Sequence, residues 1–108
     1  MAELDAEPPA VQIDMHLDQS GAQVVVLSGE LDSSSAASLQ ERMATIAPHS
    51  AQRLIFDVAG LRFMDSAGIA VLLGVAETAS SVSLRNPSPI IRRALEITGL
   101  SSVFSIEP

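Results

Sequence analysis

The chain has 108 residues and a formal net charge of −7, which suits one domain with a single core. It contains no cysteine and no lysine, which excludes disulfides and thiolate metal sites and argues against a nucleic-acid partner. The N-terminus is acidic, and no apolar run approaches the ~20 residues that cross a bilayer. The sequence therefore predicts a cytoplasmic protein without a membrane or nucleic-acid partner.

The first predicted elements are an arm and a hairpin. Residues Met1–Pro9 carry three acids and two prolines without apolar periodicity, so they are predicted to be a disordered arm ahead of one domain, residues 10–108. Apolar and polar residues alternate from Val11 to Leu17, as in a half-buried strand. Ser20-Gly21 predicts a turn, and the apolar run Val24–Leu27 predicts a second strand, so the pair should form an antiparallel hairpin.

A helix is predicted next. Either Asp32 or Ser33 can act as its N-cap, and apolar residues at helical spacing give it one buried side. These residues are Ala36, Leu39, Met43 and Ile46. Pro48 is predicted to end the helix, which places His49 in a loop.

The most informative stretch follows a third strand, residues 53–58. A short loop centred on Gly60 is predicted to end at Met64-Asp65-Ser66-Ala67-Gly68, and an apolar stretch with helical spacing comes directly after it. Ser66 is the only hydroxyl of this junction and stands where an N-cap is expected. A helix start exposes unpaired N–H groups and a partial positive charge, so it can accept a serine oxygen or a phosphate. Ser66 is therefore predicted to be a cap and a candidate switch residue.

Three further elements complete the predicted fold. Val82–Arg85 predicts a strand, and Ser88 ahead of Pro89 predicts the N-cap of a helix. Gly99 fits the position after the end of that helix, and Val103–Ile106 predicts a last short strand. Strands that alternate with helices after an opening hairpin predict an α/β fold with a mixed, largely parallel sheet and right-handed crossovers.

The serine junction resembles the signature of the STAS family, the bacterial anti-sigma factor antagonists. The matching segments are Phe63–Leu73, Leu27–Asp32 upstream, and Pro89–Leu95 and Thr98–Leu100 downstream. The similarity runs, with gaps, from about Val11 to Ile106. It implies a STAS-like mixed sheet packed with helices, and it implies that Ser66 is the phosphoacceptor.

The function implied by this resemblance is partner switching without catalysis. The unphosphorylated chain would bind an anti-sigma factor that is a serine kinase, and so release the sigma factor. Phosphorylation of Ser66 by that kinase would end binding, and a separate phosphatase would restore it. No cofactor is implied, because ATP belongs to the kinase. The implied partner-facing residues are Asp65, Ser66, Ala67 and Gly68, with Gly29, Glu30, Leu31 and Asp32 of an upstream turn.

Other functional classes are weighed against this one. STAS-like domains also serve as phosphorylation-independent subunits of lipid-transport systems or as scaffolds in larger sensory assemblies, but the retained Asp65-Ser66 pair favours the switch. An enzyme is disfavoured, because the junction lacks the first glycine of a nucleophile elbow and neither His16 nor His49 is placed as a general base. No metal site is predicted, and Asp57 is expected to stabilise a loop.

The C-terminal segment gives a last prediction. A sheet flanked by helices must bury its apolar faces, and a missing helix would leave some area uncovered. A modest exposed apolar patch of a few hundred Å² is therefore expected near Val103, Phe104 and Ile106. Weak self-association could cover such a patch.

Overall fold

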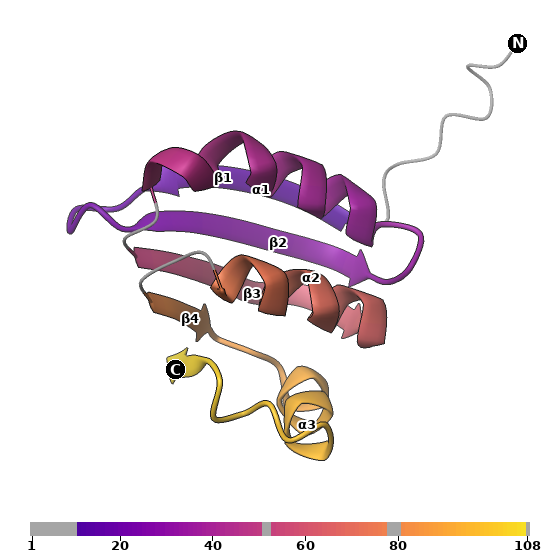
Figure 1. The fold of residues 1–108 in the computed structure, drawn as a ribbon. Coiled ribbons are helices and arrows are strands. Elements are labelled where there is room, and N and C mark those ends of the chain that lie inside the picture. Colours follow the sequence, from indigo (N-terminus) through magenta and orange to yellow (C-terminus); the bar gives the residue numbers. More distant parts are fainter. Residues whose placement is uncertain (1–10, 51–52, 78–80, 108) are drawn as a thin grey trace, which may run out of the picture.

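The computed structural model describes residues 11–50, with side chains to residue 45, and residues 53–77 and 81–107. One sheet has the strand order β1-β2-β3-β4-β5 (Figure 1). Its strands are β1 (Val11–Leu17), β2 (Gln23–Leu31), β3 (Arg53–Met64), β4 (Ser81–Arg85) and β5 (Ser105–Glu107). β1 and β2 are antiparallel, and every later neighbour is parallel. This is the predicted mixed α/β sheet, whereas the prediction of a disordered arm over Met1–Pro9 lies outside the described residues.

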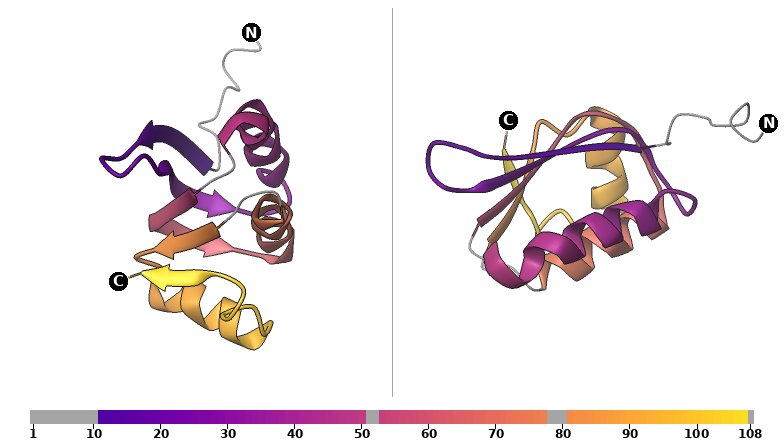
Figure 2. Two further views of the ribbon diagram at one scale, coloured as in Figure 1. Left: turned by 60° about the vertical axis from the view of Figure 1, so that its left-hand side comes forward. Right: turned by 90° about the horizontal axis from the view of Figure 1, so that it is seen from above.

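Three helices connect the parallel strands: α1 (Ala36–Ser50), α2 (Ser66–Ala76) and α3 (Pro89–Ile97). Each connection steps to the next strand in the same direction, so right-handed crossovers place all three helices on one face. A single core cluster accordingly contains side chains from every helix, and it includes Leu39 of α1, Leu72 of α2 and Leu95 of α3. α1 and α2 lie side by side across the sheet, and α3 lies at its β5 end (Figures 1 and 2).

The hairpin turn between β1 and β2 falls at Ser20-Gly21, as predicted. Asp18 organises it: its Oδ1 accepts hydrogen bonds from the Ser20 N–H (2.8 Å), the Ser20 hydroxyl (2.6 Å) and the Ala22 N–H (3.0 Å). The hydrogen bond from the Ser20 hydroxyl is the main reason that the pKa of Asp18 lies below its ordinary value. Gly21 adopts a φ of +87°, which a residue without Cβ reaches without strain.

The loop predicted around Gly60 is wrong, because β3 continues through it to Met64. The turn predicted at Gly29–Asp32 is also wrong over its first three residues, since β2 continues to Leu31. The two strands pair up to Leu31 and Met64, with two register shifts on the way. Gly29 has a φ of +97° at one shift, and a Cβ on Gly60 would come within 2.9 Å of the Ser28 Cβ. These glycines therefore allow the irregular pairing of β2 and β3, and they do not mark a loop.

α1 also runs further than predicted, since it ends at Ser50 rather than at Pro48. A proline within a helix removes the N–H that would bond to the carbonyl four residues earlier. Close to a helix end this costs one hydrogen bond, and the residues that follow can keep helical geometry. His49, predicted in a loop, therefore lies in the last turn of α1.

The caps predicted for α3 are confirmed. The Ser88 hydroxyl accepts from the Ile91 N–H (3.4 Å), and Pro89 is the first helical residue. Gly99 follows the helix with a φ of +75°, and the Leu100 N–H bonds back to the Leu95 carbonyl (2.8 Å). This is the hydrogen-bond pattern of a Schellman motif, which satisfies carbonyls that the helix end leaves unpaired.

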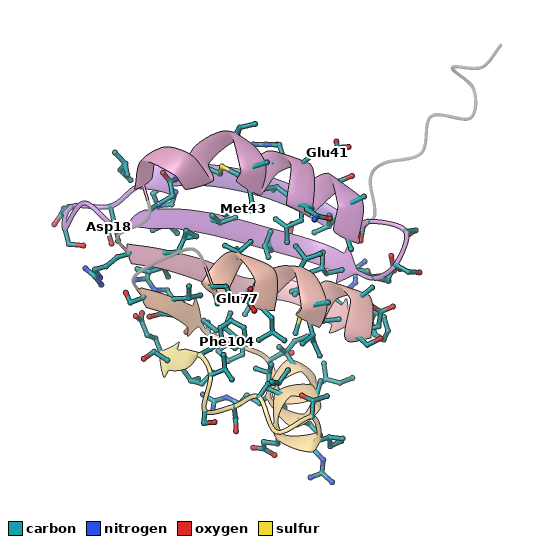
Figure 3. All side chains as sticks on the ribbon, viewed as in Figure 1. Asp18, Glu41, Met43, Glu77 and Phe104 are labelled. Carbon is teal, nitrogen blue, oxygen red and sulfur yellow. The ribbon has the colours of Figure 1, made fainter. Side chains whose placement is uncertain are left out.

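The exposed apolar patch predicted near the C-terminus is wrong at Phe104, which is only 3% exposed and belongs to the main core cluster (Figure 3). A turn closed by the Val103 N–H and the Leu100 carbonyl (3.0 Å) precedes it. β5 begins at Ser105 rather than at Val103, and Ile106 packs against the core. Of the three residues, Val103 is exposed and Ile106 is half-buried, so the apolar surface near the C-terminus is smaller than predicted.

Candidate functional site

The carboxyl ends of β2 and β3 lie next to each other, because these parallel strands pair up to Leu31 and Met64. Asp32 follows the first strand and Asp65-Ser66 follows the second. A hydrogen bond from the Asp65 N–H to the Leu31 carbonyl (3.2 Å) joins the two segments. The two halves of the predicted partner surface thus meet at the carboxyl edge of the sheet, where α/β proteins commonly bind ligands.

Asp65, and not Ser66, is the N-cap of α2, so the predicted capping role of Ser66 is wrong. Asp65 has extended backbone geometry, and its Oδ1 accepts from the N–H groups of Ala67 (2.9 Å) and Gly68 (3.1 Å). β3 ends at Met64, which leaves Asp65 as the one residue between strand and helix. A carboxylate is at least as good a cap as a hydroxyl, and its charge is favourable at the positive end of the helix dipole.

Ser66 is the first residue of α2, and its side chain is exposed. Within the described part of the chain, its hydroxyl makes no recorded hydrogen bond. The cap leaves this hydroxyl free for a reaction or a contact, because Asp65 already satisfies the helix N–H groups beside it.

Gly68 fixes how closely α2 approaches the end of β2. A Cβ built on Gly68 would lie 2.6 Å from the Leu31 carbonyl oxygen and 2.8 Å from the Leu31 Cγ. Neither contact is tolerable, and the carbonyl is part of the backbone, so no side-chain rotation relieves it. The glycine therefore holds the Ser66 end of α2 directly against the β2 segment.

Asp32 and Ser35 form a reciprocal cap ahead of α1. The Asp32 Oδ1 accepts from the Ser35 N–H (3.2 Å), while the Ser35 hydroxyl oxygen accepts from the Asp32 N–H (3.0 Å). This is capping-box geometry with serine in place of the usual Glu or Gln. Asp32 thus caps the turn at residues 33–35 that leads into α1. The sequence analysis missed Ser35, although the Asp-x-x-Ser spacing was a signal for it. Ser35 is 4% exposed and also donates to the Glu30 carbonyl (2.9 Å).

The Asp32 carboxylate gathers further donors from the following turn. Its Oδ1 accepts from the Ser34 hydroxyl (2.7 Å) and the Ser34 N–H (3.0 Å). The Ser34 hydroxyl is the largest cause of a pKa of Asp32 below its ordinary value. The group therefore stays ionised and presents a fixed negative charge on the same edge as Ser66.

The residues of the predicted surface differ in what a partner can reach. Ser66 and Glu30 are exposed, and Asp32, Asp65, Ala67 and Gly29 are half-buried. Leu31 is fully buried in the core, and Gly68 is buried. These last two residues can shape the site, but they are buried and offer almost no surface to a partner.

Two residues that the sequence analysis did not select, Arg62 and Phe63, also line this edge. Glu30 pairs with Arg62 across β2 and β3 at 3.6 Å, and both side chains are largely exposed, so the pair adds little stability. Phe63, one residue before the end of β3, is 43% exposed. A large exposed aromatic side chain beside a polar site is typical of a protein-contact residue.

The residues considered for other chemistry do not join this site. His16 is exposed on β1, and Asp57 lies within β3, where its Oδ1 accepts from the Ala59 N–H (3.2 Å). Among the described residues, no group of three or more His, Cys, Asp or Glu side chains could hold a metal ion. None of the helices described is long and apolar enough to span a membrane.

Comparison with known proteins gives consistent matches. A family model described as "Mlab, STAS domain" matches residues 15–106. The anti-sigma F factor antagonist of Lysinibacillus sphaericus is 33% identical over 82 residues, which cover 71% of this chain and 70% of that protein. The crystal structure of an anti-sigma factor antagonist from Mycobacterium paratuberculosis has a TM-score of 0.83 at 25% identity, over 95% of this chain and 90% of that one. Bacillus SpoIIAA in its phosphorylated form shares the fold, with a TM-score of 0.69 at 24% identity over 90% of this chain and 92% of that one.

Proposed function

Because this chain belongs to the STAS-domain family, we propose that it is an anti-sigma factor antagonist whose partner binding is switched off by phosphorylation of Ser66. In the unmodified state it binds an anti-sigma factor that is a serine kinase, and the sigma factor is released. The chain supplies the acceptor hydroxyl and no catalytic group. The kinase brings ATP, a separate phosphatase reverses the modification, and the exchange takes place in the cytoplasm.

The observation that carries this proposal is the position of Ser66. Its hydroxyl is exposed at the first residue of a helix whose start is held against the end of β2 by the Asp65–Leu31 hydrogen bond (3.2 Å). The same edge presents Asp32 and the exposed Phe63. A partner that docks on this edge therefore covers the acceptor, so one surface serves both binding and modification.

The cap on α2 explains why a phosphate would disrupt binding. A helix N-terminus often accommodates a phosphate through its free N–H groups. Here Asp65 already occupies the N–H groups of Ala67 and Gly68. A phosphate on Ser66, with about −1.5 to −2 charges, would lie beside the Asp65 carboxylate on a chain of net charge −7. The added charge therefore projects toward the partner.

The energy required of such a switch is small. A hundredfold loss of affinity corresponds to about 2.7 kcal/mol. Burying an unpaired dianion in an interface shaped for a neutral hydroxyl costs more than this unless the partner supplies cations. The switch can therefore act at the interface without refolding the domain.

The test is phosphorylation mapping with a binding measurement. The chain is incubated with candidate anti-sigma factor kinases and Mg-ATP, and the phosphorylated residue is identified by mass spectrometry. Phosphate is expected on Ser66, and Ser66→Ala should bind the kinase with unchanged affinity but accept no phosphate. Ser66→Asp should weaken binding at least tenfold in calorimetry, which corresponds to about 1.4 kcal/mol.

Ser33, Ser34 and Ser88 act as internal controls, because they are serines in other turns of the same chain. Modification of one of these with Ser66 unmodified would overturn the assignment. Binding to every candidate kinase without any phosphorylation would instead favour a phosphorylation-independent role, such as a lipid-transport subunit or a scaffold.

A further inference from the structure

A second surface, distinct from the Ser66 edge, lies along the free edge of β1. In the part of the chain that the structure describes, β1 pairs with β2 on one side and with no strand on the other. A groove of about 710 Å³ follows this free edge. Its floor is formed by four consecutive residues of β1, Val11–Asp14, and its wall by residues of α1.

The wall is one stripe of α1. Ser38, Glu41, Arg42 and Thr45 have the spacing that places side chains on a single helical face. All four are exposed, whereas Leu39 and Met43 between them are buried in the core. α1 and β1 lie together at the same end of the fold, and Glu41 projects from α1 on the side away from α2 (Figures 2 and 3). α1 thus flanks the position where the next strand of the sheet would lie, about 4.8 Å from β1.

The shape and chemistry of this groove fit an added strand. An edge strand presents unpaired N–H and C=O groups, which an extended segment can bond by β-augmentation. Alternate side chains of such a segment would lie on the α1 side against Ile13, and on the opposite side beside Asp14. Val11 is 3% exposed and Ile13 is half-buried, so Ile13 is the β1 side chain that offers apolar surface on the α1 side of the groove, beside the polar wall.

The charges select among the possible occupants. Asp14 and Glu41 outnumber Arg42 along the groove, and no ion pair of these three residues is recorded within the described ranges. A second copy of the chain would bring another net charge of −7, and pairing centred on Asp14 would place two aspartates opposite each other, which is destabilising. The chain's own residues Met1–Pro9 carry three acids and two prolines, so they match neither the charge nor the hydrogen bonding required.

We propose that the β1–α1 groove binds an extended, basic segment of another protein as a sixth strand of the sheet. Lysine or arginine residues of that segment lie beside Asp14 on the face away from α1, and the alternating apolar residues pack on Ile13 on the α1 face. The Glu41 carboxylate adds to the negative potential along the groove. This surface is separate from the Ser66 edge, so the proposal does not depend on phosphorylation and would let the chain hold a second protein while it switches its first.

The test uses a capped heptapeptide of alternating arginine and valine, titrated into the full chain labelled with ¹⁵N. Amide shifts are expected to change in β1 and along residues 38–45 of α1, and to change little in α2 and α3. The double variant Asp14→Lys/Glu41→Lys should weaken peptide binding at least tenfold. The matched control Glu77→Lys/Glu96→Lys makes the same change in net charge at two exposed acids outside the groove and should change affinity less than twofold.

Three results would overturn the proposal. The first is an equal loss of affinity in both double variants, or equal binding of an alternating glutamate–valine peptide, since either shows that the groove does not select a basic segment. The second is the absence of shift changes in β1 at millimolar peptide. The third is concentration-dependent shifts of β1 amides without peptide, which would identify a second copy of the chain as the occupant.

Discussion

The cap on α2 gives the sharpest test of how this site is built, because two adjacent residues compete for the role. Asp65 accepts hydrogen bonds from the N–H groups of Ala67 and Gly68, and the exposed Ser66 hydroxyl accepts none that is recorded in the described chain. Asp65→Ala should therefore destabilise the protein, while Ser66→Ala should not. If the serine were the cap, the order would be reversed.

The size of the effect follows from two contributions. Loss of an N-cap side chain costs about 1 kcal/mol, within a range of roughly 0.5–2 kcal/mol. Loss of a negative charge at the helix N-terminus adds about 0.3–1 kcal/mol. The sum, about 1.3–2 kcal/mol, should lower the Tm of a domain of this size by roughly 5–16 °C. Asp65→Asn keeps an acceptor oxygen and loses only the charge, so about 0.3–1 kcal/mol is expected.

Urea denaturation and thermal melting followed by circular dichroism measure these differences. Ser66→Ala is the matched control, because it removes one oxygen at the neighbouring position and should stay within about 0.5 kcal/mol of the parent chain. A fall in stability for Ser66→Ala as large as that for Asp65→Ala would refute the assignment of Asp65 as the cap. An unchanged Tm for Asp65→Ala would refute it as well.

Three further changes test the packing and electrostatics around the site. Gly68→Ala should destabilise the protein by about 1–3 kcal/mol, because the new Cβ meets the Leu31 carbonyl. Gly74→Ala is the control: a Cβ there meets nothing within 4 Å, so this change should stabilise α2 by about 0.5–1 kcal/mol. Similar urea midpoints for the two variants would contradict this. The lowered pKa of Asp32 stabilises the fold above its ordinary value of 3.8 and ceases to do so as the pH falls through the folded pKa. The difference in urea midpoint between the parent chain and Asp32→Asn should therefore be present at pH 6 and shrink below pH 3.8, and a difference that grows in acid would have the wrong sign. Phe104→Ala should cost about 3–5 kcal/mol as a buried aromatic truncation, whereas a loss below 1 kcal/mol would mean that Phe104 is not a core residue.

The sequence by itself determined the order and type of the elements, because these depend on local periodicity and local hydrogen bonding. Alternation from Val11 to Leu17 requires a half-buried strand whatever lies next to it. The Ser88–Pro89 start and the Gly99 end of α3 are likewise set by neighbours within a few residues. The position of Ser66 at the start of the helix that follows the third strand was likewise predicted from the apolar patterns on either side of it.

Only the tertiary structure decided where β2 and β3 end, and this settled the details of the site. Gly60 and Gly29 read locally as loop and turn residues, yet pairing between the two strands carries both through to Leu31 and Met64. That extension left Asp65 as the single residue between β3 and α2, and so gave it the cap instead of Ser66. Phe104 was buried for a similar reason, since the turn before β5 points it into a core built from distant segments. Long-range pairing and burial contribute more free energy than one local turn preference, so they override it wherever the two conflict.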